Sequence, residues 1–312
     1  MPDSVIPPLS LRDHDRDFAA FAGSMGDTYA RYGFAVVADH GLPTETIDGC
    51  LARFREFFAW PTDRKMAYHV PGTGGARGYT PFGVETAKDA RHFDLKEFWH
   101  VGRELPPDHR YRRYMPDNLW VREIEGFRDY TLGAYEALDA LGRKLLRAIA
   151  RFLGLADDYF DDKVALGNSV LRVLHYPPVE GAPEGVRSGA HEDINAITLL
   201  LGAEEAGLQI KDRDGRWLPI NPPPGCIVVN VGDMLQRLTN HRLPSTTHRV
   251  VNPAPERARF PRYSMPFFLH FEPEFLIETL PGCVTDDAPN RYPSPITADG
   301  YLQQRLREIK LL

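Results

Sequence analysis

Hydrophobic residues recur at helical spacing in three parts of the N-terminal half of the chain. Two of these stripes lie near the start, and a short run of strand-forming residues separates them. The pattern predicts helices over residues 15–31, from Thr44 to the residue before Pro61, and over residues 122–154, with a strand over residues 34–37. We expect Thr44 to cap the second helix and Gly154 to end the third.

The pattern changes between residues 169 and 271, where apolar runs rich in valine, isoleucine and phenylalanine alternate with turn residues. Residues 211–217 predict a hairpin, and the prolines at 222–224 predict a connection outside any strand ladder. Antiparallel strands in this number favour a double-stranded β-helix, or jelly roll, with helices on one outer side. A last helix is expected over residues 301–312. The predicted fold class is therefore α+β with a mainly β core.

Charge and composition narrow the range of partners. The 312 residues include 37 Lys+Arg and 43 Asp+Glu, for a net charge of −6, and no basic block stands out. Nucleic acid and anionic membranes are therefore not expected as main partners. The chain shows no signal peptide, and no apolar stretch approaches the roughly 18 residues of a membrane-spanning helix.

The cysteine pattern points to a reducing compartment. Cys50, Cys226 and Cys283 are odd in number, far apart and without C-x-x-C spacing. They predict neither a disulfide framework nor a zinc site, so we expect a cytoplasmic protein. Cys226 lies in an apolar run and is expected to be an inert buried thiol.

The first candidate functional residues are His191 and Asp193, in the segment His191-Glu192-Asp193, together with His248. Residues two apart on a strand share a face, so His191 and Asp193 should point inward together while Glu192 points outward. His248 lies in a β-branched segment that is also predicted to be extended. Two imidazoles and one carboxylate are the protein ligands of a non-haem Fe(II) site that keeps open positions.

Arg262 and Ser264 form a second candidate pair, because they share one face of the strand predicted around them. A guanidinium and a neighbouring hydroxyl can donate several hydrogen bonds to one carboxylate. A single His-x-Asp or Arg-x-Ser is common by chance, and a solvated strand or a core histidine explains either one alone. Together, in this order and on predicted strands, the His-x-Asp motif, His248 and the Arg-x-Ser motif indicate a site for a metal and an anion.

Three further stretches resemble signatures of a known family: residues 32–43, residues 174–178, and the block from 207–210 through 230–236. With them, nearly the whole chain resembles the isopenicillin N synthase-like branch of the Fe(II)/2-oxoglutarate-dependent oxygenases, as a bacterial-type member. The resemblance implies an enzyme that uses Fe(II), 2-oxoglutarate and O2. It would couple oxidative decarboxylation of 2-oxoglutarate to oxidation, most commonly hydroxylation, of a small-molecule substrate.

The resemblance also implies roles for residues of this sequence. Iron would be bound by His191, Asp193 and His248, the distal carboxylate of 2-oxoglutarate would be held by Arg262 and Ser264, and Tyr176 would be a further contact to the cosubstrate. Thirteen residues separate His248 from Arg262, somewhat more than in plant members, and we interpret them as a longer hairpin loop.

The implied organisation is a single oxygenase domain over residues 1–312. It would comprise an N-terminal helical and mixed part at 1–165, a jelly-roll core at 166–275 and a C-terminal segment at 276–312. The oligomeric state stays open, since nothing resembles a long heptad seam.

Several other side chains lie near the motifs in sequence. In relatives, the region from 70 to 118 folds over the iron, so four of its side chains are either substrate contacts or packing at the rim: Arg77, Tyr79, Phe82 and Trp99. Arg172 would share a strand face with Tyr176, and it either binds an anion or forms a structural salt bridge. The histidines at 175, 241 and 270 are more simply explained as packed residues than as metal ligands.

Two other functions stay open at this stage. An oxidase like isopenicillin N synthase would use the same iron and take all electrons from its substrate, and its Arg-x-Ser pair would grip the substrate carboxylate. His191-Glu192-Asp193 and the residues after it look more like that enzyme than like plant members. A jelly-roll binding protein without turnover is the third hypothesis, although such a protein would be expected to lose part of the site.

Overall fold

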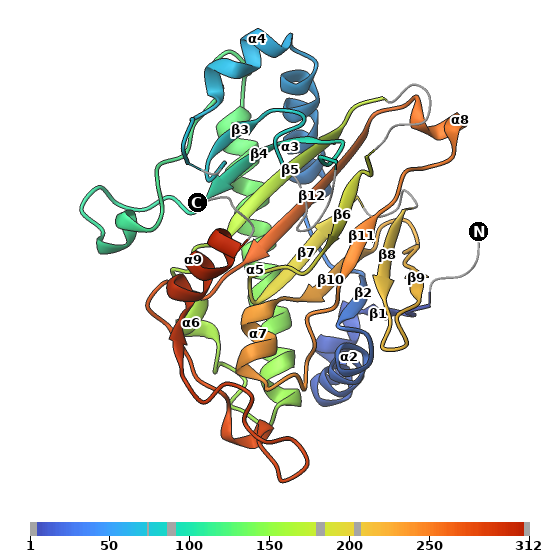
Figure 1. Cartoon of the computed structure of the whole chain (residues 1–312), viewed down its shortest axis with the longest axis vertical. Coiled ribbons are helices and arrows are strands. Elements are labelled where there is room, and N and C mark those ends of the chain that lie inside the picture. The colour runs from blue at the N-terminus through green and yellow to red at the C-terminus, as the bar shows by residue number, and fades with distance from the viewer. Residues whose placement is uncertain (1–4, 74, 86–91, 179–184, 203–206, 309–312) are drawn as a thin grey trace.

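Two β-sheets face each other in the computed structural model, which describes residues 5–73, 75–85, 92–178, 185–202 and 207–308. Helices cover the outer side of the larger sheet (Figure 1). The arrangement is the predicted jelly roll with flanking helices.

The larger sheet has eight strands in the order β1-β2-β10-β7-β12-β5-β4-β3. They are β1 (Pro8–Ser10), β2 (Phe34–Ala38), β10 (Ile227–Val231), β7 (Ile197–Leu201), β12 (Arg262–Leu269), β5 (Val170–Tyr176), β4 (Glu97–Gly102) and β3 (Gly78–Thr80). Neighbouring strands are antiparallel except β1 and β2, which are parallel. Strands far apart in the sequence, such as β2 and β10, therefore share one hydrogen-bonded sheet.

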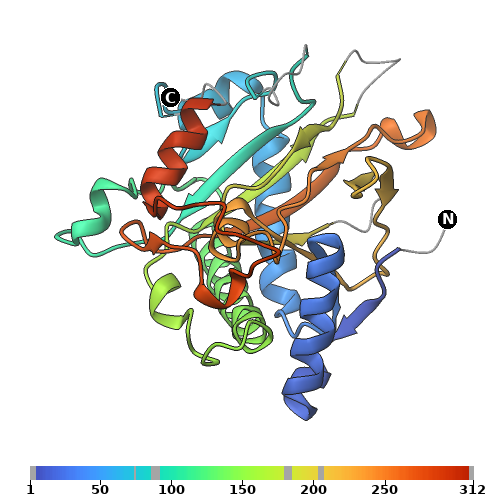
Figure 2. The same ribbon diagram turned by 60° about the horizontal axis from the view of Figure 1, so that its bottom comes forward.

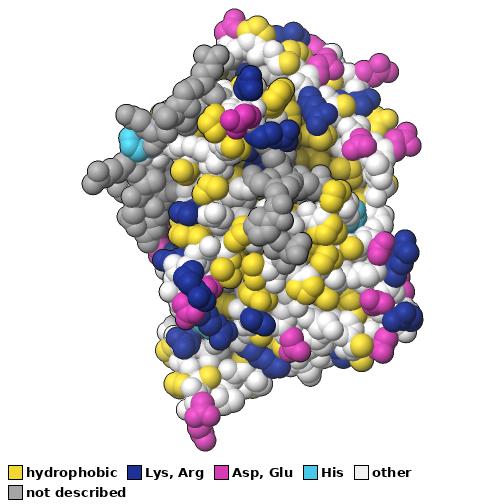
Figure 3. All heavy atoms as spheres, turned by 90° about the vertical axis from the view of Figure 1, so that its right-hand side faces the viewer, with side chains coloured by type: hydrophobic (Ala, Val, Ile, Leu, Met, Phe, Trp, Pro, Cys, Tyr) yellow, Lys and Arg dark blue, Asp and Glu magenta, His cyan; other side chains and the backbone are white. Residues whose placement is uncertain are grey.

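The smaller sheet has four strands in the order β6-β11-β8-β9. They are β6 (Ser188–His191), β11 (His248–Val250), β8 (Leu208–Lys211) and β9 (Trp217–Pro219), and a separate pair is formed by β13 (Leu276–Ile277) and β14 (Ile296–Thr297). β8 and β9 form the hairpin predicted from residues 211–217. On the side of the molecule where β8, β9 and α8 (Pro255–Ala258) lie, hydrophobic side chains gather near the middle of the face, and charged side chains of both signs lie mainly toward its edges (Figure 3).

The helices lie on both faces of the larger sheet. They are α1 (Leu11–Arg16), α2 (Phe18–Tyr32), α3 (Thr44–Phe58), α4 (Thr62–Lys65), α5 (Phe127–Phe152), α6 (Asp161–Val164), α7 (Asp233–Leu238), α8 and α9 (Ala298–Glu308), with 3-10 turns at Met66–Tyr68, Arg110–Arg113 and Pro281–Cys283. α3 and α5 contact each other and the outer face of the sheet. The C-terminal helix α9 lies on the opposite face, far from α2 (Figures 1 and 2).

The predicted helices are present, but several ends differ. α5 begins at Phe127 instead of residue 122, because Gly126 before it has a left-handed φ of 70°. Gly154, with φ of 75°, follows the end of α5 as predicted. Thr44 does not cap α3: it is the first helical residue, and Pro43 in the cap position makes no side-chain hydrogen bond. α9 begins at Ala298, earlier than predicted, and its expected end at 309–312 lies outside the described residues.

The segment between His248 and Arg262 is not the long hairpin that the sequence predicts. β11 pairs with β6 and β8 in the smaller sheet, whereas β12 pairs with β5 and β7 in the larger one. The thirteen residues therefore cross from one sheet to the other and include α8. A crossing between sheets needs more chain than a turn between paired strands.

The helix-facing side of β4 packs into an aromatic core. Trp99 is fully buried, and its ring centroid lies 4.9 Å from that of Phe57 and 5.4 Å from that of Phe127, both nearly perpendicular to it. Edge-to-face packing of this kind stabilises beyond the burial of area alone. Helices α3 and α5 are thereby fixed against the strand.

The prediction that Cys226 is a buried thiol is confirmed. Cys50, Cys226 and Cys283 are all buried, and no disulfide joins them. Among the described residues, no helix has both the length and the apolar character needed to cross a membrane.

Replacement of a core ring should test this packing. Phe57→Ala should lower the free energy of unfolding by about 3–5 kcal/mol, because it removes a buried ring and leaves a cavity. Urea unfolding followed by tryptophan fluorescence measures the change. The matched control is Phe260→Ala, whose ring is 56% exposed, and it should change stability by less than about 0.5 kcal/mol. Equal losses in the two variants would contradict the role assigned to the aromatic core.

Candidate active site

The structure brings together His191, Asp193 and His248, the residues singled out by their spacing. Strand pairing places His248 directly opposite His191, with the two ring centroids 4.4 Å apart. The Nε2 atoms of these histidines lie 3.7 and 3.9 Å from Asp193 Oδ1. One ligand atom from each residue lies within 4.8 Å of the others, and no other cluster of this kind occurs in the described part of the chain. This donor set fits Fe(II) with open positions.

Hydrogen bonds orient the two histidines for metal binding. His191 Nδ1 lies 2.7 Å from the carbonyl oxygen of Gly189, and His248 Nδ1 lies 3.1 Å from that of Thr246. A proton on Nδ1, donated to these carbonyls, leaves each Nε2 lone pair available to a cation. Burial also lowers the pKa of His248 to about 4, so its ring is neutral at physiological pH.

The carboxylate of Asp193 is held from its other side. Thr198 Oγ1 donates to Asp193 Oδ2 at 2.6 Å, and Asn230 Nδ2 donates to the same oxygen at 2.8 Å. Burial opposes ionisation, but the nearby histidines and these hydrogen bonds outweigh it and keep the pKa of Asp193 below its ordinary value. The oxygen that faces the histidines is thus left for a metal.

Asp193 lies on a turn and not on the strand predicted for it. β6 ends at His191, and the next strand, β7, begins only at Ile197. The turn is fixed because the backbone N–H of Asp233 donates to the carbonyl of Asp193 at 2.7 Å. His191 and Asp193 still share one side, but through this turn instead of through strand alternation.

Arg262, Ser264 and Tyr176 also lie together, on the inner face of the larger sheet. Arg262 pairs with Tyr176 in the β12–β5 register, and its guanidinium lies 5.1 Å from the centre of the tyrosine ring. All three side chains are buried, and Arg262 Nη2 donates to the carbonyl of Gly202 at 3.2 Å. A Cβ at Gly202 would lie 2.8 Å from the carbonyl oxygen of Tyr263, so only glycine allows this close approach.

A cavity of about 520 Å³ lies beside the histidine–aspartate cluster. His191 and Asp193 line it, together with residues of the larger sheet and of α9, whereas Arg262, Ser264 and Tyr176 are not part of its wall. The volume is within the range of small-molecule sites.

Several ionisable residues in this wall were not recognised in the sequence, among them Glu85, Asp94, Lys96 and His100. Lys96 Nζ lies 2.9 Å from Glu85 Oε2 and 2.8 Å from Asp94 Oδ2. Burial alone would lower the pKa of Lys96, but the two carboxylates hold it above its ordinary value. The sequence signal that could have revealed Asp94, Lys96 and His100 is the mixture of ionisable and aromatic residues over 94–100. Such a mixture is typical of a strand with one face toward a polar site.

The side chains predicted near the iron fall into two groups. Arg77 and Arg172 line the cavity, and Arg172 forms the predicted type of salt bridge, with Glu85 at 3.3 Å. Tyr79 and Trp99 are not substrate contacts, since both are buried in the core on the helix side of the sheet. Strand alternation turns them away from the cavity. Phe82 is 42% exposed and packs against Phe93 at the surface.

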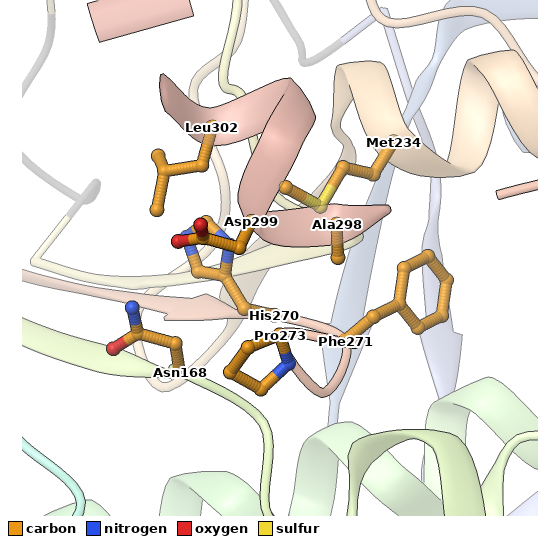
Figure 4. Close-up of a pocket in the computed structure, with 8 residues that line it drawn as sticks. All are labelled: Asn168, Met234, His270, Phe271, Pro273, Ala298, Asp299 and Leu302. Carbon is orange, nitrogen blue, oxygen red and sulfur yellow. The ribbon is translucent and has the colours of Figure 1, made fainter. Parts of the chain in front are cut away.

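Of the three remaining histidines, His175 and His270 are buried, as predicted, whereas His241 is exposed and lies beside the ring of Tyr292. His175 stacks on Tyr263, with ring centroids 4.8 Å apart, and His241 lies 2.6 Å from the hydroxyl of Tyr292. His270 and Leu302 line the large cavity and also, together with Asp299, a small pocket between β12 and α9 (Figure 4). This pocket holds about 10 Å³, which is at most the space of one water molecule.

Comparisons with known proteins match both halves of the chain. The sequence profile of the 2OG-Fe(II) oxygenase superfamily matches residues 167–271, and that of the non-haem dioxygenase in morphine synthesis N-terminal region matches residues 6–123. A 2-oxoglutarate-Fe(II) type oxidoreductase of Emericella nidulans is 32% identical over 311 residues, which cover 92% of this chain and 87% of the relative.

Solved structures agree with these matches. A putative 2OG-Fe(II) oxygenase family protein from Caulobacter crescentus is 57% identical, with a TM-score of 0.93 over 98% of this chain and 100% of that one. A full-length Neurospora crassa protein, in complex with alpha-KG and thymine, is 28% identical, with a TM-score of 0.85 over 98% of each chain. The chain belongs to the 2OG-Fe(II) oxygenase superfamily and is an enzyme that depends on Fe(II), 2-oxoglutarate and O2.

Proposed function

We propose that His191, Asp193 and His248 hold Fe(II) in this enzyme. The observation that carries the proposal is the convergence of their three ligand atoms within 4.8 Å. The hydrogen bonds from Thr198 and Asn230 to Asp193 support it, because outer partners of this kind orient ligands and raise metal affinity. When bound, the iron supplies O2 activation at the positions that the protein leaves open.

Arg262 and Ser264 are proposed to hold the distal carboxylate of 2-oxoglutarate, with Tyr176 as a further contact. Support comes from their common face on the larger sheet and from the burial of the guanidinium, which strengthens its attraction for an anion. The complex of the Neurospora crassa protein with alpha-KG adds support, because a relative of this fold binds the cosubstrate.

The proposed reaction is the hydroxylation of a small molecule, coupled to oxidative decarboxylation of 2-oxoglutarate. The cavity beside His191 and Asp193 has room for such a substrate. The complex of the Neurospora crassa protein with thymine supports a small-molecule substrate here. We assign the enzyme to the isopenicillin N synthase-like branch, as a user of 2-oxoglutarate instead of an oxidase.

The proposed organisation is one oxygenase domain over residues 1–312, made of the parts 1–165, 166–275 and 276–312. The pairing of β2 with β10 and of β4 with β5 supports a single domain, because each pair joins the first part to the second in one sheet. A cytoplasmic location is proposed from the three buried cysteines, between which no disulfide forms.

Loss of the carboxylate ligand should abolish iron binding. Asp193→Ala should weaken Fe(II) binding by more than about 100-fold, beyond the loss expected for removing an outer hydrogen-bond partner. Anaerobic equilibrium dialysis with iron analysis measures the affinity. Glu192→Gln is the matched control, because Glu192 accepts a hydrogen bond from Thr247 and is not part of the cluster. If both variants bind iron like the wild type, the assignment of the triad is wrong.

The cosubstrate assignment can be tested separately from the metal. Arg262→Gln should weaken 2-oxoglutarate binding about 100-fold, as expected when one partner of a buried charge pair is removed, while Fe(II) binding is kept. The visible charge-transfer band of the chelated 2-oxo acid, followed in an anaerobic titration, measures this affinity. Arg259→Gln, at an exposed arginine before the same strand, should titrate like the wild type. A wild-type protein that binds iron but never develops the band would favour the oxidase.

A further inference from the structure

Among the described residues of the cavity wall, one cation forms no salt bridge. Lys96 is paired with Glu85 and Asp94, and Arg172 is paired with Glu85. Arg305 of α9 is paired with Asp233 at 3.3 Å. Within the part of the chain that the structure describes, Arg77 forms no salt bridge, although it is only 5% exposed.

Arg77 occupies a place that a glycine in β4 leaves open. Gly102 pairs with Val170, which lines the cavity, so a side chain at position 102 would point to the same inner face. A Cβ built on Gly102 would lie 1.8 Å from Arg77 Nη2 and 2.1 Å from its Cζ. The guanidinium therefore lies flat on the cavity side of the sheet because position 102 carries no side chain.

The hydrogen bonds of this guanidinium are incomplete. Arg77 Nη1 donates to the carbonyl of Ala76 at 2.7 Å. Nε and Nη2 are buried and have no hydrogen-bond partner among the described residues. Burial lowers the pKa of Arg77 to about 10, so the side chain still carries its charge at neutral pH. A buried charge with unsatisfied donors is costly until an anion or a hydrogen-bond acceptor completes it.

The unsatisfied donors have a definite geometry. Nε and Nη2 form one edge of the guanidinium, whose two parallel N–H groups match the two oxygens of a carboxylate. A guanidinium that carries one charge is neutralised by a monoanion, whereas a phosphate dianion would leave an excess negative charge. The wall around this position also has apolar side chains from three elements, Val170, Phe268 and Leu302.

We propose that the primary substrate is a small monocarboxylic acid with an apolar body, and that Arg77, placed by Gly102, binds its carboxylate. The inference rests on the proposed function, since it concerns the substrate of the same cavity. The 2-oxoglutarate carboxylate is assigned to Arg262, so Arg77 serves the second ligand. Arg77 thereby selects the substrate by charge, while the apolar wall accommodates the part of the substrate that lies closer to the histidines.

The test uses a panel of small aliphatic and aryl carboxylic acids, each paired with its primary amide, and inorganic phosphate. Ligand-observed NMR measures their binding to the full chain loaded with Zn(II), as a diamagnetic substitute for Fe(II), and 2-oxoglutarate. Acids should bind to the wild type, whereas their amides and phosphate should not. Calorimetry on the tightest acid should then show a loss of about tenfold or more in Arg77→Gln, equivalent to at least about 1.4 kcal/mol.

Two more variants distinguish the effect of the position of the Arg77 side chain from the effect of a positive charge in general. Gly102→Ala keeps the arginine but fills its place, so it should weaken acid binding about as much as Arg77→Gln does. Arg16→Gln, at a side chain that is 83% exposed, removes one positive charge elsewhere and should leave acid binding unchanged. Circular dichroism and the affinity for 2-oxoglutarate, measured in each variant, show that the fold and the cosubstrate site are intact.

Several outcomes would overturn the inference. The inference is wrong if no acid binds to the wild type, or if amides or phosphate bind as well as the acids. It is also wrong if Arg77→Gln binds the acids as tightly as the wild type does. A parallel loss of 2-oxoglutarate affinity in Arg77→Gln would instead assign this arginine to the cosubstrate. Failure of the wild type to bind 2-oxoglutarate would count against the proposed function itself, so the two failures are distinguishable.

Discussion

Side-chain alternation across the larger sheet is the constraint on which the rest of the structure depends. Successive residues of a strand face opposite sides, and here one side packs on helices while the other faces the cavity. Trp99 and His100 are neighbours in β4, yet Trp99 is fixed in the aromatic core and His100 lines the cavity. A one-residue shift in pairing would exchange these roles, so core packing and site assembly depend on the same register.

Apart from Arg77, buried charges on both sides of this sheet are paired locally. On the helix side, Glu97 accepts hydrogen bonds from Lys65 at 2.8 Å and Tyr79, and it lies 2.7 Å from His175. On the cavity side, Glu85 and Lys96 are paired in a similar way. Removing one partner from such a pair would leave an unbalanced buried charge, which costs several kcal/mol. These networks specify one arrangement of β4 and β5 and so keep Tyr176 on the inner face.

The proposed metal ligands come from segments that the smaller sheet and one turn bring together. The β6–β11 pairing sets His248 opposite His191, and the turn after β6 returns Asp193 to the same place. The hydrogen bonds to Asp193 come from β7 and β10 of the larger sheet, through Thr198 and Asn230. The site therefore lies where the two sheets meet, and its geometry depends on both.

The sequence by itself determined the fold class and indicated the candidate site residues. His191, Asp193 and His248 were found because metal ligands must be particular residue types, and the helices and strands were found because burial imposes a period. The sequence did not determine which faces of β3 and β4 would meet the cavity, so it left Tyr79 and Trp99 as either substrate contacts or rim packing. It also missed Glu85 and Lys96. Only the tertiary structure decided those roles, because they depend on pairings such as Gly102 with Val170 and on long-range contacts that spacing along one segment does not encode.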